Sequence, residues 1–300
     1  MKHKSVLLEE VITYLNVSEG KTYIDATVGY AGHSGEILRK LNKKGFLFAV
    51  DQDQEAIDYS QNKLSQIGDN FKIIKTNFSN LKDYIHENVD GILFDLGVSS
   101  PQLDEVDRGF SFHKDAPLDM RMDKDNPLNA SIVVNEYSYE KLVMILKKYG
   151  EEKFAPSIVK NIINNRPIKT TLELAEIIKS SGPISYRNKS HPARKTFQAI
   201  RIEVNHELDI LEQSLYDAFD LLKVGGRLCV ISFHSLEDKI VSKVFKDLCS
   251  EYEKAKYLPI VPDELKARAK KIVKLTPSDE ELEDNNRSRS SKLRVIERIN

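Results

Sequence analysis

The chain has 300 residues, of which 40% are hydrophobic and 30% are charged, and its formal net charge is −1. This apolar content is enough for a sizeable core and excludes a wholly disordered chain, whereas the balanced charge excludes an overall basic excess, so a polyanion would have to bind local basic patches. The sequence shows no signal peptide, no run of about 18 apolar residues and no metal-ligand or disulfide pattern in Cys229 and Cys249, which predicts a cytoplasmic protein without a membrane partner.

A glycine-rich turn follows the first expected strand. The elements expected here are a helix over residues 6–15, a strand over residues 22–27 and a helix over residues 34–41. Glycines in the turn, residues 28–35, let the backbone approach a ligand, and the helix N-terminus offers free N–H groups. Ala31 and Ser34 stand where the dinucleotide fingerprint requires glycine, so the turn is a poor NAD site. A tight connection that binds nothing is the alternative.

Asp51 is the candidate ribose ligand. The elements expected next are strands over residues 46–50 and 71–75 and a helix over residues 54–64. An acid at the end of the second strand, about twenty residues beyond a glycine turn, can accept hydrogen bonds from a ribose diol, and Asp53 is better placed than Asp51 to cap the helix that follows. After the third strand, Phe78 lies where an aromatic ring could flank an adenine, although an isolated phenylalanine usually packs in the core.

The fourth expected strand leads into the candidate reaction site. Residues 90–95 are a short apolar run, and the chain then becomes small, polar and proline-marked. Ligands of open parallel sheets collect at the carboxyl ends of the strands, so Asp95, Ser99, Ser100 and Gln102 lie where chemistry is expected. A turn whose serines cap a helix is the alternative. The repeated strand–helix order predicts a doubly wound α/β sheet.

A long helical insertion with a basic end interrupts this sheet. The expected elements are loops over residues 108–112 and 117–123, pinned by Phe110 and Phe112 or lining a site, and helices over residues 139–148, 153–164 and 171–179, the last with a capping box from Thr170 and Glu173. Residues 184–202 contain no acid, and Tyr186 and Phe197 interleave their basic side chains, which suits phosphate binding. These side chains are Arg187, Lys189, Arg194, Lys195 and Arg201, together with His191. A solvated helix start is the alternative.

The sheet resumes after the insertion. The expected elements are an amphipathic helix over residues 207–222, a strand over residues 227–233, a helix over residues 236–248 and an edge strand over residues 292–298. We expect Ser235 to cap the second of these helices, and the role of His234 at the strand end stays open. Two further basic clusters lie within residues 266–274 and 287–294.

Blocks across nearly the whole chain resemble one family, the bacterial methyltransferases that modify N4 of a cytosine in the decoding centre of 16S ribosomal RNA with S-adenosylmethionine. These blocks are residues 3–8, 25–34, 90–104, 108–112, 117–123, 191–208, 225–238 and 286–298. The resemblance implies a class I, Rossmann-like methyltransferase sheet formed by residues 1–104 and 196–300, with an inserted all-helical substrate-recognition domain at residues 105–195. It implies 16S rRNA in the small ribosomal subunit as the partner and no metal, and it leaves a homodimer open.

The resemblance also implies roles for individual residues. The cofactor contacts that it implies are Ala31, Gly32, His33, Asp51, Phe78, Asp95 and Gln102. Ala31 replaces a more usual glycine, which is acceptable if its φ is negative, and Lys195 stands where the family often has threonine or arginine, which keeps the positive field. Methyl transfer requires the cytosine N4 amine to lie in line with the sulfonium methyl while an acceptor takes its hydrogen bond. By analogy with other amino-methyltransferases, the candidate acceptors are Asp95, assigned first to the cofactor, Ser99 and Ser100.

The RNA would be held with its cytosine exposed or flipped. The residues expected to bind the RNA are Arg187, Lys189, His191, Arg194 and Arg201. Two other functions share part of this pattern. A nicotinamide-dependent oxidoreductase would share the fold but is disfavoured by Ala31 and Ser34, and a non-catalytic RNA-binding assembly factor would share the basic patches.

Overall fold

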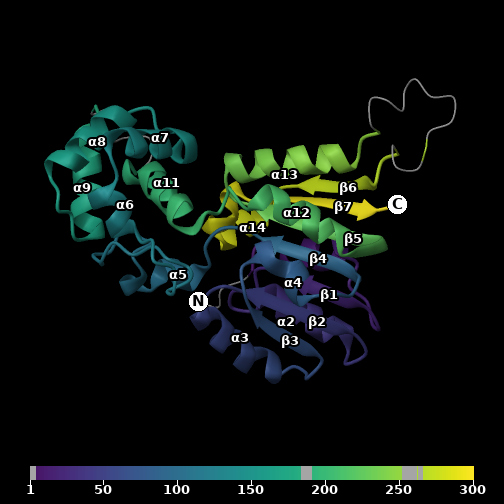
Figure 1. The fold of residues 1–300 in the computed structure, drawn as a ribbon. Helices are drawn as coiled ribbons and strands as arrows, with labels where there is room; N and C mark the ends of the chain where they lie inside the picture. Colours follow the sequence, from purple (N-terminus) through teal and green to yellow (C-terminus); the bar gives the residue numbers. More distant parts are fainter. Residues whose placement is uncertain (1–4, 184–190, 252–261, 263–265) are drawn as a thin grey trace. The chain divides into compact units, whose positions relative to one another are not determined.

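The computed structural model describes residues 5–183, 191–251, 262 and 266–300, which form two compact units (Figure 1). The sheet unit consists of Met1–Gly97 and Leu208–Asn300, and the helical unit is Val98–Glu207. The sequence analysis placed the boundaries near residues 104 and 196 instead. The second boundary differs because α11, Ala193–Asn205, packs against other helices of the insertion and therefore belongs to the helical unit.

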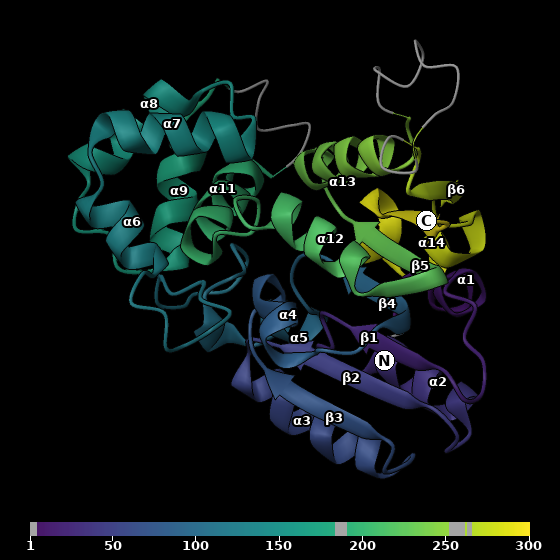
Figure 2. The same ribbon diagram turned by 45° about the vertical axis from the view of Figure 1, so that its right-hand side comes forward.

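The sheet unit contains a seven-stranded sheet in the order β3-β2-β1-β4-β5-β7-β6 (Figure 2). The strands are β1 (Thr22–Asp25), β2 (Phe46–Asp51), β3 (Phe71–Lys75), β4 (Val89–Asp95), β5 (Leu222–Ser232), β6 (Ala269–Leu275) and β7 (Lys292–Arg298). Neighbouring strands from β3 to β5 run parallel, whereas β7 is antiparallel to both β5 and β6. This topology confirms the predicted class I, Rossmann-like methyltransferase sheet.

The strand expected over residues 292–298 is confirmed as β7, but the prediction that it lies at the edge of the sheet is wrong. β7 pairs with β5 on one side and with β6 on the other, so β6 is the edge of the described sheet. β6 was interpreted from sequence only as a basic cluster because Lys270, Lys271 and Lys274 interrupt its apolar residues. Lysines on a strand are a common way to protect a sheet edge from further pairing, which explains both their presence and the missed strand.

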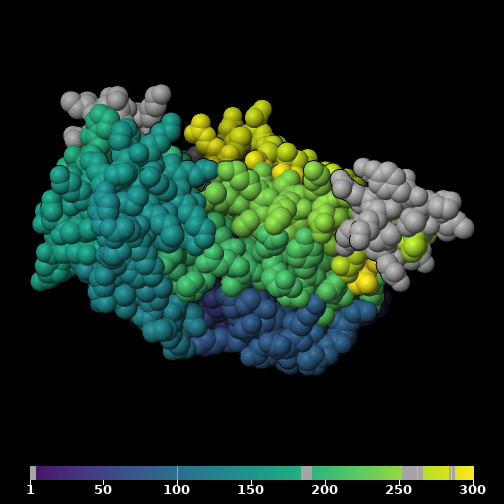
Figure 3. Space-filling model, turned by 45° about the horizontal axis from the view of Figure 1, so that its top comes forward, coloured from purple at the N-terminus to yellow at the C-terminus, as the bar shows by residue number. Residues whose placement is uncertain are grey.

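Helices cover both faces of the sheet, because successive strand residues point to opposite sides. Ile92 and Val230 pack in the core cluster that α4, α12 and α13 complete, and Leu93 and Cys229 pack in the cluster that α1, α2 and α3 complete. The helices of this unit are α1 (Leu8–Tyr14), α2 (Gly32–Leu41), α3 (Gln54–Ser65), α4 (Leu81–Tyr84), α12 (Leu211–Asp220), α13 (Ser235–Leu248) and α14 (Asp279–Asp284). The outer surface of α13 appears in light green in Figure 3. None of the helices that the structure describes has the length and apolar character needed to cross a membrane.

The helical unit confirms the helices expected in the insertion. Its helices are α5 (Ser100–Asp104), α6 (Ala130–Glu136), α7 (Tyr139–Gly150), α8 (Ala155–Asn164), α9 (Thr171–Ser181) and α11. The predicted capping box of α9 is present, since Thr170 Oγ1 accepts a hydrogen bond from the Glu173 amide and the Glu173 carboxylate accepts one from the Thr170 amide.

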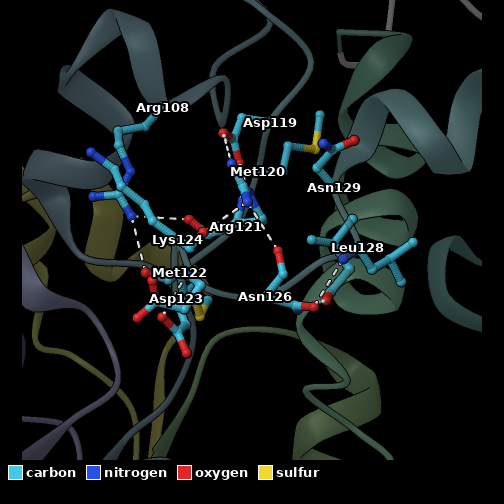
Figure 4. Close-up of polar contacts among 12 residues, drawn as sticks. Arg108, Asp119, Met120, Arg121, Met122, Asp123, Lys124, Asn126, Leu128 and Asn129 are labelled. Carbon is cyan, nitrogen blue, oxygen red and sulfur yellow. Dashed lines mark hydrogen bonds and ion pairs between the residues drawn. The ribbon is translucent and has the colours of Figure 1, made fainter.

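A buried arginine holds the long loop that precedes α6 (Figure 4). Arg108 is 4% exposed and donates a hydrogen bond of 2.9 Å from Nη2 to the carbonyl oxygen of Arg121. Arg121 in turn forms two side-chain hydrogen bonds with Asp119, at 2.8 and 2.9 Å. The Arg108 guanidinium also lies 5.8 Å from the ring centroid of Phe110, so the predicted phenylalanine contact and an unpredicted polar network together order this loop.

Candidate active site

The glycine-rich turn between β1 and α2 has an unusual backbone at Ala31. Ala31 is fully buried, begins α2 as its N-cap and has a φ of 51°. The expectation that alanine is acceptable here through a negative φ is therefore wrong. A left-handed conformation costs an L-residue about 1–2 kcal/mol, so the surrounding turn must impose it, as happens in loops whose backbone groups are aimed at a ligand.

Gly32 lies against the N-terminal segment of the chain. A Cβ atom added to Gly32 would be 1.7 Å from Ser5 Oγ and 3.1 Å from Ser5 Cβ, so only glycine fits while Ser5 keeps its place. In the same N-terminal segment, two residues after Ser5, Leu7 has a φ of 53°. Its amide donates a 2.8 Å hydrogen bond to the Glu281 carboxylate of α14. One side of the turn is therefore closed by the chain itself.

His33 is a buried, neutral side chain. Its Nε2 lies 3.0 Å from the carbonyl oxygen of Val6 and must carry the proton of that hydrogen bond, so Nδ1 has only a lone pair. Burial lowers the pKa of His33 to about 4, which keeps the ring uncharged at neutral pH. Nδ1 lies 3.6 Å from Asp95 Oδ2. The imidazole can thus accept a hydrogen bond on this side but cannot donate one.

Asp51 anchors the glycine-rich turn. One oxygen of Asp51 accepts the Gly29 amide at 2.9 Å, and the other accepts the Asp53 amide at 3.0 Å. Burial raises the pKa of Asp51 to about 6. Its alternative role as a helix cap belongs to Asp53, whose Oδ1 accepts the Glu55 amide, as the sequence analysis expected.

Asp25 is a second acid of this site, which the sequence analysis missed. It ends β1, is 1% exposed and accepts hydrogen bonds from Ser34 Oγ at 2.7 Å and from the Thr27 amide at 3.2 Å. Burial raises its pKa to about 6. The rule that selected Asp51, an acid at the end of a parallel strand, would have selected Asp25 if the first strand had not been extended to Thr27.

Asp95 ends β4 with an incompletely satisfied carboxyl group. Its Oδ1 is buried and has no hydrogen-bond partner among the described residues. Burial, followed by the negative charges of Asp25 and Glu237, raises the pKa of Asp95 to about 8. Buried polar atoms rarely lack a partner in a native protein, and such an exception is expected where a ligand supplies the missing group. The three strand-end acids therefore form a site suited to a positively charged ligand.

Phe78 and His234 are two further candidates from the sequence analysis, and each follows a strand of the sheet. Phe78 begins η1 (Phe78–Asn80), is half-buried and packs edge-on against Phe94, with ring centroids 5.5 Å apart. The prediction that Ser235 caps α13 is wrong, because the cap is one residue earlier. His234 Nδ1 accepts the Glu237 amide at 3.3 Å, and the Glu237 carboxylate accepts the amides of His234 and Phe233. A histidine replaced the usual Ser, Thr, Asp or Asn of this capping box, so the pattern was not recognised.

Ser99, Ser100 and Gln102 belong to the helical unit, where they begin α5. Ser99 Oγ accepts the Gln102 amide at 3.3 Å, and Gln102 Oε1 accepts the Ser99 amide at 2.9 Å. The helix-capping alternative is thus present for Ser99. Its hydroxyl hydrogen remains available to a further acceptor, because the cap uses only an oxygen lone pair.

The residues of the predicted basic segment differ in whether the protein already supplies a hydrogen-bond partner for the side chain. Arg201 forms two hydrogen bonds with Glu207, at 2.8 and 2.9 Å, and both side chains are largely buried, so its charge is already paired. Lys195 donates to the carbonyl oxygen of Glu151 at the C-terminal end of α7. Arg194 and His191 are exposed at the start of α11. Tyr186, Arg187 and Lys189 lie outside the described residues. The described residues contain no cluster of three or more His, Cys, Asp or Glu side chains that could hold a metal ion.

A family model and two curated relatives point to the same family. The model of the MraW methylase family matches residues 1–299. The chain is 53% identical over 306 residues to the ribosomal RNA small subunit methyltransferase H of Mycoplasma mycoides subsp. mycoides, and 50% identical over 307 residues to that of Mycoplasma capricolum subsp. capricolum, with 99% of each chain covered in both cases. Among solved structures, an rRNA methylase from Streptococcus thermophilus has a TM-score of 0.46 at 12% identity and full coverage of both chains.

Proposed function

Because the chain belongs to the MraW methylase family, we propose that this S-adenosylmethionine-dependent methyltransferase modifies N4 of a cytosine in the decoding centre of 16S ribosomal RNA. The relatives' names support small-subunit ribosomal RNA as the substrate, which would locate the reaction in the cytoplasm. The observation that carries the proposal is the Asp95 carboxyl at the end of β4, whose buried Oδ1 is an unused acceptor. The helical unit would be the substrate-recognition domain.

The residues around Asp95 fit a cofactor that carries a sulfonium and an amine. Acids whose pKa values are raised by burial regain stability when a cation lies beside them, and the orphaned Oδ1 of Asp95 offers an acceptor for such a group. When bound, S-adenosylmethionine supplies an electrophilic methyl group. The residues that would hold it are Ala31, Gly32 and His33 of the turn, Asp51 at the ribose, Phe78 beside the adenine, Asp95 near the methionine part, and Gln102.

The chemical difficulty lies in the N4 amine, whose lone pair is delocalised into the cytosine ring. The protein must orient this amine and stabilise the positive charge that develops on it. An ionised Asp95 can accept a hydrogen bond from N4–H and then its proton. His33 Nδ1, 3.6 Å from Asp95 Oδ2 and without a proton, adds a second lone pair beside that carboxyl. Ser99 and Ser100 remain the alternative acceptors.

Cofactor affinity should rise with pH. Asp25 and Asp51 have pKa values of about 6 and Asp95 of about 8 in the free protein, and a cationic ligand prefers their ionised forms. We expect S-adenosylmethionine affinity to increase about tenfold between pH 6 and pH 8, with protons released on binding. Titration calorimetry in buffers of different ionisation enthalpy measures both. S-adenosylhomocysteine, which lacks the sulfonium charge, is the control and should show a smaller rise; equal pH profiles for the two ligands would contradict the assignment.

The same acids should make the free protein less stable at high pH. A carboxyl group whose folded pKa is raised stabilises the fold fully below its unfolded pKa and loses that contribution as the pH rises through the folded value. For these acids the loss extends from about pH 4 to about pH 8. Cofactor binding opposes it, so the stabilisation by S-adenosylmethionine should be larger at pH 8 than at pH 6.

Charge reversal separates two arginines that the sequence grouped together. Arg194→Glu should lower RNA affinity about tenfold at low salt and reduce the salt slope of binding by more than one, because Arg194 is exposed. Arg201→Glu should chiefly lower the midpoint of thermal unfolding, since it places a second acid against Glu207. Filter binding over a salt series and thermal unfolding test both variants, and calorimetry should show unchanged cofactor affinity. If Arg201→Glu alone loses RNA affinity and keeps its thermal stability, Arg201 binds the RNA and Arg194 does not.

The proposed function is tested by radiolabelled methyl transfer to small ribosomal subunits from a strain that lacks the modification, followed by mapping of the labelled base. The expected result is incorporation at N4 of one decoding-centre cytosine. Incorporation at another position would refute the N4 assignment but keep the methyltransferase activity. Protein-free 16S rRNA in a parallel reaction shows whether the assembled subunit is required.

A further inference from the structure

We propose that Phe112, His113 and His191 form a stacking platform in the helical unit that binds an unpaired nucleobase of the RNA, apart from the base that is methylated. This inference deepens the proposed function and rests on RNA being the substrate.

Four aromatic rings from two segments of the helical unit form one cluster, in which Phe112 and His191 are stacked and the other contacts are tilted or edge-on. Phe112 and His191 lie nearly parallel, with centroids 4.4 Å apart and an interplanar angle of 19°. His113 contacts both, at 4.4 Å from Phe112 and 5.2 Å from His191. Phe197 of α11 supports Phe112 edge-on at 5.5 Å. Residues 78 positions apart in the chain therefore meet in one aromatic cluster.

The aromatic cluster extends from the core to the surface of the helical unit. Phe197 is 4% exposed and Phe112 is half-buried, whereas His113 and His191 are both exposed. An aromatic cluster that served packing alone would bury its outermost rings. This cluster instead ends in two imidazoles, which are flat enough to stack on a base and polar enough to remain in water.

The platform is held on a rigid support. His191 Nδ1 accepts the Ala193 amide at the start of α11. On the other segment, the Thr171 hydroxyl of α9 donates to the carbonyl oxygen of Lys114 at 2.6 Å and accepts the Ala116 amide at 3.1 Å, which fixes the chain beside His113. Rings fixed in advance lose little conformational entropy when a base stacks on them.

The charges near the platform suit a nucleotide rather than a peptide helix or a lipid. Arg194 is exposed one turn from His191. Partial burial, then His113 and then Lys179 of α9 lower the pKa of His191, whereas Glu176, which pairs with Lys179 at 3.2 Å, opposes this. The platform thus offers flat aromatic rings beside cations. Bases stacked on aromatic rings with phosphates near basic side chains are the usual mode of single-stranded RNA binding.

Binding of a ten-nucleotide single-stranded oligoribonucleotide, measured by fluorescence anisotropy without cofactor, tests the proposal. His191→Ala should weaken binding about tenfold, whereas His191→Phe, which also loses the Nδ1 cap but keeps a flat ring, should bind like the wild type. His86→Ala, at an exposed histidine of the sheet unit, is the matched control and should change nothing. The salt slope should be the same in the wild type and in His191→Ala, because stacking releases no counterions.

A series of abasic oligonucleotides identifies the stacked base. Removal of the stacked base should lower the RNA affinity of the wild type by the same factor as His191→Ala does. Combining the two changes should cause no further loss of affinity. Additive losses, a reduced salt slope in His191→Ala, equal losses for His191→Phe and His191→Ala, or no binding by the wild type would overturn the platform. Methyl transfer is assayed separately. If the two losses of RNA affinity are not additive but no N4 methylation occurs, the proposed function is refuted and the platform is not. If N4 methylation occurs but the two losses of RNA affinity are additive, the platform is refuted and the proposed function is not.

Discussion

Asp95→Asn should slow methyl transfer by about two to three orders of magnitude while the protein stays folded. Asparagine has nearly the same shape, so the buried site at the end of β4 keeps its packing. Its amide oxygen can still accept one hydrogen bond, but it cannot take up a proton or balance positive charge on the N4 amine. Single-turnover rates with saturating labelled S-adenosylmethionine measure this step without the contribution of cofactor affinity.

The matched control is Asp90→Asn, at the opposite end of the same strand. Asp90 lies near the start of β4, away from its carboxyl end. It accepts a hydrogen bond from the Thr22 amide at 3.0 Å and pairs with Lys223 at 2.9 Å. This variant should retain the wild-type rate. If Asp95→Asn transfers methyl groups at the wild-type rate and only binds the cofactor less tightly, Asp95 is a cofactor ligand and the proton acceptor is Ser99 or Ser100.

Asp51→Ala should have the largest effect on cofactor binding, raising the dissociation constant by about a hundredfold. Each hydrogen bond to a charged group contributes about 1.5–3 kcal/mol, and alanine removes both the ribose acceptors and the carboxylate that holds the Gly29 amide in the turn. Calorimetric titration with S-adenosylmethionine measures the loss.

Asp53→Ala is the control for Asp51→Ala, because Asp53 is the neighbouring acid but caps α3. It should cost about 1 kcal/mol of stability through the lost cap and leave the affinity for the cofactor nearly unchanged. An Asp51→Ala protein with wild-type affinity would exclude Asp51 as the ribose ligand.

The sheet was predictable because its signals are local. Apolar runs bounded by turn residues gave β3 with the bounds that the structure has, residues 71–75, and placed Asp51 and Asp95 at strand ends. The strand–helix repeat then predicted a doubly wound α/β sheet. Acids at the ends of adjacent parallel strands must meet at one edge, so most of the candidate site followed from the same pattern.

The features that sequence reasoning missed depend on partners distant in the chain or on backbone angles. A positive φ at Ala31 cannot be inferred for a residue other than glycine. The alternating pattern of β7 predicts an edge strand, because the sequence does not show that β6 pairs with it. The sequence does not show that Arg201 is paired, because its partner Glu207 lies beyond the end of the same helix. The aromatic platform joins Phe112 to His191 across most of the insertion, and no local spacing signals that contact.

The way the sheet unit is divided along the chain has a consequence for folding during synthesis. The helical unit is one uninterrupted segment and can fold as soon as it has left the ribosome. The sheet unit must wait for its second half: β4 pairs with β5, β5 with β7, and the segment that closes the glycine-rich turn is tied by Leu7 to Glu281. We therefore expect the nascent chain to acquire its cofactor site only when synthesis is nearly complete, after the helical unit, which we propose to bind the RNA, has already formed.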